Sequence, residues 1–135
     1  MGAVVKFLLV IQVVFASTGS FSGATTRYAW GENIGWIDFG SGEGAVLVSD
    51  TELTGYAWGE NIGWISLNCS NTSSCATVNY KVTNTTGGQL DGYAWSENAG
   101  WINFDPSQGA EPSINTSTGE ITGYAWGENI GWINF

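Results

Sequence analysis

An acidic and an amide side chain stand next to each other at four places in the chain, each time two residues after a Trp. The four pairs are Glu32-Asn33, Glu60-Asn61, Glu97-Asn98 and Glu128-Asn129. Carboxylate and amide oxygens are ligands for Ca²⁺, and both groups can also bond the hydroxyls of a sugar. The flanking Gly residues favour a tight turn instead, in which Glu is solvent-exposed and Asn bonds its own backbone or takes the left-handed conformation. We expect turns, because no loop matches a calcium-binding repeat.

Aromatic residues surround these pairs, since all eight Trp and four of the five Tyr lie close to them. Exposed aromatic faces could form a platform that stacks on sugar rings, but aromatics repeated at one register are also typical of a repeat core. We predict that the Trp residues form the core as a ladder of cross-strand pairs, six residues apart. These pairs are Trp30 with Trp36, Trp58 with Trp64, Trp95 with Trp101, and Trp126 with Trp132. The candidate ligand contacts are Tyr28, Tyr56, Tyr93 and Tyr124, each of which has a polar tip.

Catalytic chemistry finds little support in the residue types. The chain has no His, and its twelve acidic residues include no pair that stands out for hydrolysis. No nucleophile has a neighbouring base, because every Lys is isolated. We therefore expect no enzyme, no catalytic residue, no metal and no cofactor.

The two cysteines, Cys69 and Cys75, lie six residues apart in a loop rich in Ser, Asn and Thr. In an exported chain these two cysteines would be oxidised to a disulfide, which stabilises the fold by roughly 2 kcal/mol. Four Asn residues begin sequons for N-glycosylation, and all lie between the aromatic phrases. These candidate glycosylation sites are Asn68, Asn71, Asn84 and Asn115.

The motifs belong to a twelve-residue phrase that occurs four times. Its copies span Tyr28–Phe39, Tyr56–Leu67, Tyr93–Phe104 and Tyr124–Phe135. Short strand patterns and turn residues separate the copies, and no helical period is sustained across 25–135. We predict an all-β domain over 25–135, built as a four-repeat antiparallel hairpin meander, β-sandwich or solenoid around the Trp ladder. A four-bladed propeller is the alternative.

The phrase GYAWxENxGWIxF resembles a repeat of predicted secreted and surface proteins of uncultured bacteria. It stands here at 55–67, 92–104 and 123–135, and Arg27 replaces the Gly in the first copy. The resemblance implies display at the cell surface or outside the cell. It implies no activity and no catalytic residue.

The charge balance excludes two classes of partner. Twelve acidic and three basic residues give a net charge of −9, which disfavours nucleic acid and anionic membranes. Residues 1–24 contain an apolar run that predicts either a secretory signal peptide or an N-terminal donor strand, and it is too short to span a membrane. In the donor-strand hypothesis, one apolar face mediates assembly. That face consists of Val5, Phe7, Leu9, Ile11, Val13 and Phe15.

The final repeat ends at Phe135 with no polar cap, which predicts an open β edge. We therefore predict a structural subunit of an extracellular filament or surface layer, which polymerises with itself head to tail. The alternative is a secreted carbohydrate-binding or adhesion module, with glycans as its partners.

Overall fold

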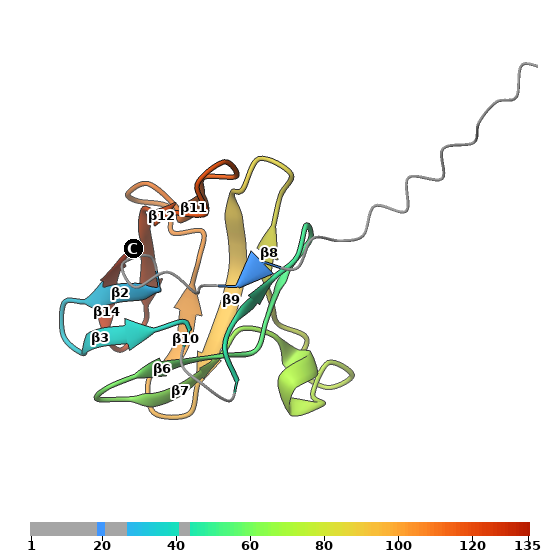
Figure 1. The fold of residues 1–135 in the computed structure, drawn as a ribbon. Helices are drawn as coiled ribbons and strands as arrows, with labels where there is room; N and C mark the ends of the chain where they lie inside the picture. The colour runs from blue at the N-terminus through green and yellow to red at the C-terminus, as the bar shows by residue number, and fades with distance from the viewer. Residues whose placement is uncertain (1–18, 21–26, 41–43) are drawn as a thin grey trace, which may run out of the picture.

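Each repeated phrase folds into one antiparallel β-hairpin (Figure 1). In the computed structural model, which describes residues 19–20, 27–40 and 44–135, the two Trp of each phrase face each other across the hairpin. The hairpins are β2 (Tyr28–Gly31) with β3 (Gly35–Asp38), β6 (Tyr56–Gly59) with β7 (Gly63–Ser66), β9 (Leu90–Ser96) with β10 (Gly100–Asn103), and β13 (Tyr124–Gly127) with β14 (Gly131–Asn134). The all-β class and the antiparallel hairpin meander are confirmed.

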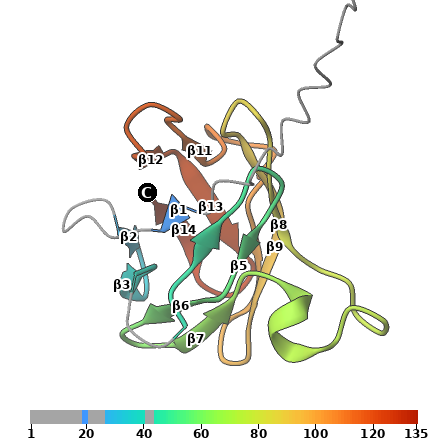
Figure 2. The same ribbon diagram turned by 45° about the vertical axis from the view of Figure 1, so that its right-hand side comes forward.

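The four hairpins join into one closed ring of eight strands. β3 pairs with β6, β7 with β9, β10 with β13, and β14 returns to pair with β2. The meander is therefore a barrel, and of the alternatives left open by the sequence neither the β-sandwich, the solenoid nor the propeller is formed. The four hairpin turns lie together at one end of the barrel, and in Figures 1 and 2 they run from the left side to the bottom of the molecule.

The predicted open edge at the last strand is absent. β14 bonds β13 on one side and β2 on the other, where Ile133 faces Gly31 and Asn134 faces Trp30. Closure of a barrel removes the edges that the first and last strands of a meander would otherwise expose. The terminal repeat needs no polar cap, because the first repeat covers it.

The barrel interior is filled by Ala and Ile side chains. Along β2 the side chains alternate, with Ala29 buried and Tyr28 and Trp30 exposed. The same alternation in the other strands produces one continuous buried cluster. Its Ala and Ile members from the hairpins are Ala29, Ile34, Ile37, Ala57, Ile62, Ile65, Ala94, Ala99, Ile102, Ala125, Ile130 and Ile133.

The Trp residues are paired as predicted, but the prediction that they form the core is wrong. Five of the eight are exposed, namely Trp30, Trp36, Trp58, Trp64 and Trp126, and the other three are half-buried. The interior of an eight-stranded barrel is only wide enough for side chains of modest size. The strand period then forces the indoles to the outside, where each pair is in contact with ring centroids 4.7–4.9 Å apart.

The described segments outside the hairpins pack around the barrel, one before the first hairpin and the others between hairpins. They form β1 (Gly19–Ser20), β4 (Leu47–Val48), β5 (Leu53–Thr54), β8 (Val82–Asn84), β11 (Ser113–Ile114), β12 (Ile121–Thr122) and the short 3₁₀ helix η1 (Cys69–Thr72). β1 pairs with β4 of the same chain, and β8 extends the sheet beside β9. Phe39 and Phe104 both contact Phe135, with ring centroids 5.3 and 5.7 Å apart. The buried cluster therefore continues from the interior of the barrel to the space beneath these segments.

The third repeat departs from the others at two positions that compensate for each other. Gly31 has no room for a side chain, because a Cβ there would collide with Ile34. At the equivalent places the third repeat has Ser96 and Ala99, and the Ser96 Oγ accepts a hydrogen bond of 3.2 Å from the Ala99 amide. The smaller Ala99 side chain leaves space that the Ser96 side chain fills, so the barrel core keeps its packing.

The assembly residues predicted between Val5 and Phe15 lie outside the described residues. The same is true of the rest of the predicted signal peptide or donor strand, apart from β1. In the described part of the chain, no helix has the length and apolar character needed to cross a membrane.

Substitutions at two neighbouring residues compare how much the inside and the outside of the barrel contribute to stability. We expect Ile65→Ala to lower the free energy of unfolding by about 2–5 kcal/mol, because it leaves a cavity in the core. Trp64→Ala removes one exposed cross-strand partner and should cost only about 1 kcal/mol. Urea titration followed by far-UV circular dichroism measures both, since fluorescence would be altered by the missing indole. Equal costs for the two variants would contradict the outward position of Trp64.

Candidate functional site

The Glu-Asn pairs lie in the hairpin turns, and they tie each turn to the turn of the neighbouring repeat. Asn33 Nδ2 donates to the Ile130 carbonyl at 3.0 Å, and Asn61 Nδ2 donates to the Ile34 carbonyl at 2.8 Å. The Nδ2 atoms of Asn98 and Asn129 donate to backbone carbonyls of the preceding repeat in the same way. The expectation of turns is confirmed, but the Asn side chains bond a neighbouring repeat rather than their own backbone. Gly rather than Asn adopts the left-handed conformation, as at Gly35 with φ of 77°.

Three of the four Glu carboxylates also hold neighbouring repeats together. Glu32, Glu60 and Glu128 each accept a hydrogen bond of 2.9–3.0 Å from the backbone amide of a Trp in the adjacent repeat. A Cβ on Gly35 would collide with the Glu60 carboxylate, so this contact requires glycine there. The recurring carboxylate–amide motif is thus mainly a clamp that closes the ring of turns.

Glu97, in the third repeat, does not make this clamp. Among the described residues its carboxylate has no hydrogen bond and no ion pair, although the adjacent Asn98 keeps its bond to the Ile62 carbonyl at 2.8 Å. The glycine that faces this turn, Gly63, lies near Asn98 and Trp58 rather than near a carboxylate. One of four equivalent acids is therefore available for another role.

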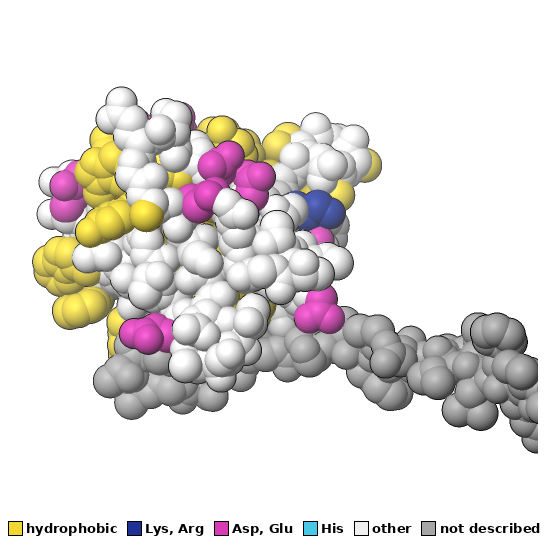
Figure 3. Space-filling model, turned by 90° about the horizontal axis from the view of Figure 1, so that it is seen from above, with side chains coloured by type: hydrophobic (Ala, Val, Ile, Leu, Met, Phe, Trp, Pro, Cys, Tyr) yellow, Lys and Arg dark blue, Asp and Glu magenta, His cyan; other side chains and the backbone are white. Residues whose placement is uncertain are grey.

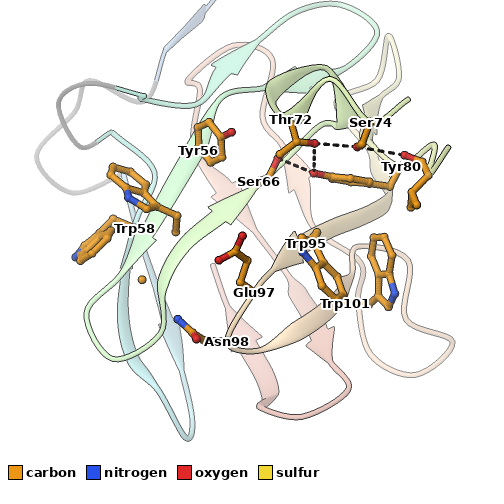
Figure 4. A pocket seen from close by; sticks show the side chains of 13 residues that line it. Tyr56, Trp58, Ser66, Thr72, Ser74, Tyr80, Trp95, Glu97, Asn98 and Trp101 are labelled. Atoms are coloured by element: carbon orange, nitrogen blue, oxygen red, sulfur yellow. Dashed lines mark hydrogen bonds between the residues drawn. The ribbon is translucent and has the colours of Figure 1, made fainter. Parts of the chain in front are cut away.

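Glu97 faces a groove between the second and third hairpins (Figure 4). The groove has a volume of about 1000 Å³. In Figure 4, Trp58 stands on one side of the Glu97 carboxylate and Trp95 and Trp101 stand on the other. Trp64 and Tyr56 complete the wall of the second repeat. The groove thus presents aromatic surfaces on two sides of a single carboxylate.

A polar wall closes the groove along the segment after β7. Thr72, Ser74 and Tyr80 line it, and their hydroxyls form one connected set. Thr72 Oγ1 lies 2.8 Å from Ser74 Oγ and 3.4 Å from the Tyr80 hydroxyl, which donates to the buried Ser66 Oγ at 2.9 Å. The wall comes from the longest interval between phrases, and the described residues at the other junctions between repeats form no equivalent of it.

The predicted disulfide between Cys69 and Cys75 is present and anchors this wall. Cys69 is buried at the start of η1, and its amide donates to the Tyr80 carbonyl at 2.8 Å. Asn68 precedes η1 and accepts a hydrogen bond from the Ser70 amide, which fixes the first turn. The loop is thus tied to the barrel at both of its ends.

The phenol of Tyr56 belongs to the same polar network. Burial raises the pKa of Tyr56, and the nearby phenol of Tyr80 raises it further. The Tyr56 hydroxyl therefore stays protonated around neutral pH and donates to the Asn71 carbonyl at 3.0 Å. The charge among the described residues that line the groove comes from Glu97 alone.

The four Tyr residues predicted as ligand contacts lie on the outer face, each edge-on to a Trp of its own hairpin. Tyr56 lines the groove, and Tyr93 lines a smaller hollow of about 620 Å³ that shares Val78, Tyr80 and Trp101 with it. Tyr28 and Tyr124 line neither. Sequence reasoning missed Tyr80 and the special role of Glu97. The unequal length of the second interval was the signal that could have identified Tyr80.

The structure separates the four candidate glycosylation sites. Asn68 is buried and its Nδ2 donates to the Leu53 carbonyl, so the folded chain cannot accept a glycan there. Asn71 and Asn84 are half-buried, and their Nδ2 atoms are committed to the carbonyls of Gly55 and Ser49. Asn115 is exposed and uses only its Oδ1, so its Nδ2 remains available for modification.

The clamp gives a direct comparison between equivalent acids. Glu60→Ala should lower the free energy of unfolding by about 1 kcal/mol, because the Trp36 amide loses its acceptor. Glu97→Ala should change the free energy of unfolding by less than about 0.5 kcal/mol, since its carboxylate bonds no backbone group in the described part of the chain. Urea unfolding measures both variants under identical conditions. A loss with Glu97→Ala that matches the Glu60→Ala value would show that Glu97 is a fourth clamp.

The disulfide should stabilise the groove wall locally as well as the whole fold. The double variant Cys69→Ser/Cys75→Ser should lose about 2 kcal/mol of stability by the loop-entropy model. Hydrogen exchange should accelerate most between residues 70 and 78, where the loop backbone bonds are short-range. Mass spectrometry of unreduced peptides provides the check on the bond itself, and two free thiols would disprove it.

Comparison with known proteins identified no relative. The sequence matches no family model, and the searches of curated proteins and of solved structures returned no match.

Proposed function

We propose that this protein is a secreted module that binds carbohydrate in the groove between its second and third hairpins. The observation that carries the proposal is the groove itself. It combines exposed indole surfaces from Trp58 and Trp64, facing Trp95 and Trp101, with a wall of hydroxyl groups.

Exposed aromatic surface of this kind calls for a functional explanation. Trp64 is 48 % exposed and Trp58 is 40 % exposed, and both line the same concave surface. Contiguous apolar patches on a soluble protein commonly mark binding sites. An indole has a negative face, on which the weakly positive C–H groups of a sugar ring pack favourably. Flat rings on two sides of a groove suit a chain of such sugar units.

The polar groups of the groove complement the aromatic ones. Ligand sites usually combine apolar walls with a few placed polar groups that orient the ligand. Thr72, Ser74, Asn98 and Glu97 supply donors and acceptors within reach of the groove. Sugar hydroxyls can exchange hydrogen bonds with each of these groups. The smaller hollow beside Tyr93 continues the surface across Trp101, which supports a ligand of several sugar units.

An extracellular location fits the disulfide, because such bonds persist in oxidising compartments. Self-assembly into a filament has less support than the sequence suggested. The final strand pairs with β2 instead of offering an edge, and the predicted donor strand lies outside the described residues. We therefore place the binding module first and the filament second.

Matched Trp variants test the proposal. Isothermal titration with a panel of soluble oligosaccharides should identify at least one that binds the full chain. Trp64→Ala and Trp101→Ala should each weaken that binding at least tenfold, which corresponds to about 1.4 kcal/mol. Trp36→Ala is the control, because it removes an exposed indole at the same place in the first repeat, and Trp36 does not line the groove.

Two results would overturn this proposal. One is the absence of binding to every oligosaccharide in a panel that covers neutral, acidic and amino sugars. The other is an equal loss with Trp36→Ala, which would move binding away from the groove. Sedimentation of the same samples reports the filament alternative, since a filament would sediment far faster than a 14.4 kDa monomer.

A further inference from the structure

We propose that the sugar bound in the groove carries a cationic amino group, as in a de-N-acetylated amino sugar, and that Glu97 is its counter-ion. This inference rests on the proposed function and names the class of ligand. It starts from the difference between Glu97 and its three equivalents.

Glu97 occupies a position at which the fold normally uses the carboxylate. Glu32, Glu60 and Glu128 accept the amide of a Trp in the adjacent repeat, and the carboxylate then lies against a glycine. In the third repeat the same acid is retained, while the contact with the backbone is not made. A carboxylate that has no partner among the described residues and faces a groove has acceptor positions to offer a ligand.

The surroundings of Glu97 favour a cation. Its carboxylate lies between Trp58 and the pair Trp95 and Trp101 in Figure 4. Indole faces attract ammonium groups through the negative potential of the ring. The same rings that stack on the sugar would therefore also attract its charged substituent. A carboxylate and aromatic faces together make the type of site that recognises an ammonium group.

No protein cation competes for Glu97 among the described residues of the groove. Lys81 lines the adjacent hollow, but it is paired with Glu52 at 3.2 Å. Arg27 is paired with Asp38 at 2.8 Å. The net charge of −9 adds a negative field, and Figure 3 shows acidic side chains across the end of the molecule seen from above. Such a field raises the local concentration of cationic ligands.

Two other cationic ligands fit less well. A calcium ion takes six to eight oxygen ligands, whereas this groove supplies one carboxylate. A peptide with a lysine commonly docks by adding a strand to an open sheet edge. The strands beside the groove are already paired on both sides, since β7 lies between β6 and β9 and β9 lies between β7 and β10. The row of wall hydroxyls is better suited to the hydroxyls of a sugar.

The test compares two oligomers of equal length, one of glucosamine and one of N-acetylglucosamine, by titration into the full chain. We expect the glucosamine oligomer to bind about tenfold more tightly at low salt, with a preference that shrinks as salt is added. Glu97→Gln should weaken glucosamine binding about tenfold and change N-acetylglucosamine binding less than twofold. Glu60→Gln is the matched control and should change neither, because its amide oxygen can still accept the Trp36 amide.

The outcomes distinguish this inference from the proposed function. If both oligomers bind equally, depend on Trp64 and ignore Glu97→Gln, the groove binds sugar but the cationic ligand is wrong. If neither these oligomers nor the wider oligosaccharide panel binds, the proposed function fails as well. A lysine peptide that binds more tightly than the glucosamine oligomer, and depends on Glu97, would replace the sugar as the ligand.

Discussion

The pairing of β14 with β2 is the constraint on which the rest of the structure depends. It converts a linear meander into a ring, so each turn has a neighbour on both sides. The bond from Asn33 to the Ile130 carbonyl crosses this junction and reproduces the bonds between the other turns. Closure also narrows the interior, and a narrow interior accepts Ala and Ile but excludes indoles. The exposed aromatic surface is therefore a consequence of closing the barrel.

Fourfold repetition would produce four equivalent surfaces, but two local departures make one junction different. The disulfide loop adds a polar wall between the second and third hairpins only, and Glu97 leaves its backbone contact at the same junction. A binding site needs several different groups at one place, whereas a repeat distributes the same groups evenly. Both departures from the repeat occur at one groove, which makes this groove the candidate binding site among otherwise equivalent surfaces.

Sequence reasoning recovered the local structure because its signals are local. The six-residue spacing of Trp58 and Trp64 predicted their pairing across a hairpin, and the spacing of Cys69 and Cys75 predicted their disulfide. The side of the sheet on which the indoles lie depends on how wide the interior is, and that depends on a contact between the first and last repeats. Such a contact has no signature in the spacing of residues. The missing backbone contact of Glu97 could not be predicted from the sequence either, because its phrase still has Glu and Asn at the usual positions.

Stability and the proposed binding depend on different residues in this fold, and that separation has a consequence for how the surface can vary. Ile65 points into the barrel while its neighbour Trp64 points into the groove, so a change in one strand position affects one property far more than the other. The backbone bonds that close the ring involve Asn side chains and main-chain groups, none of which depends on the indoles. The Tyr and the two Trp on the outside of each hairpin can therefore be substituted without opening the barrel. The presence of the Trp pair in every repeat, including Trp30 and Trp126, which do not line the groove, indicates that the cross-strand ring contact itself stabilises each hairpin in addition to any role in binding.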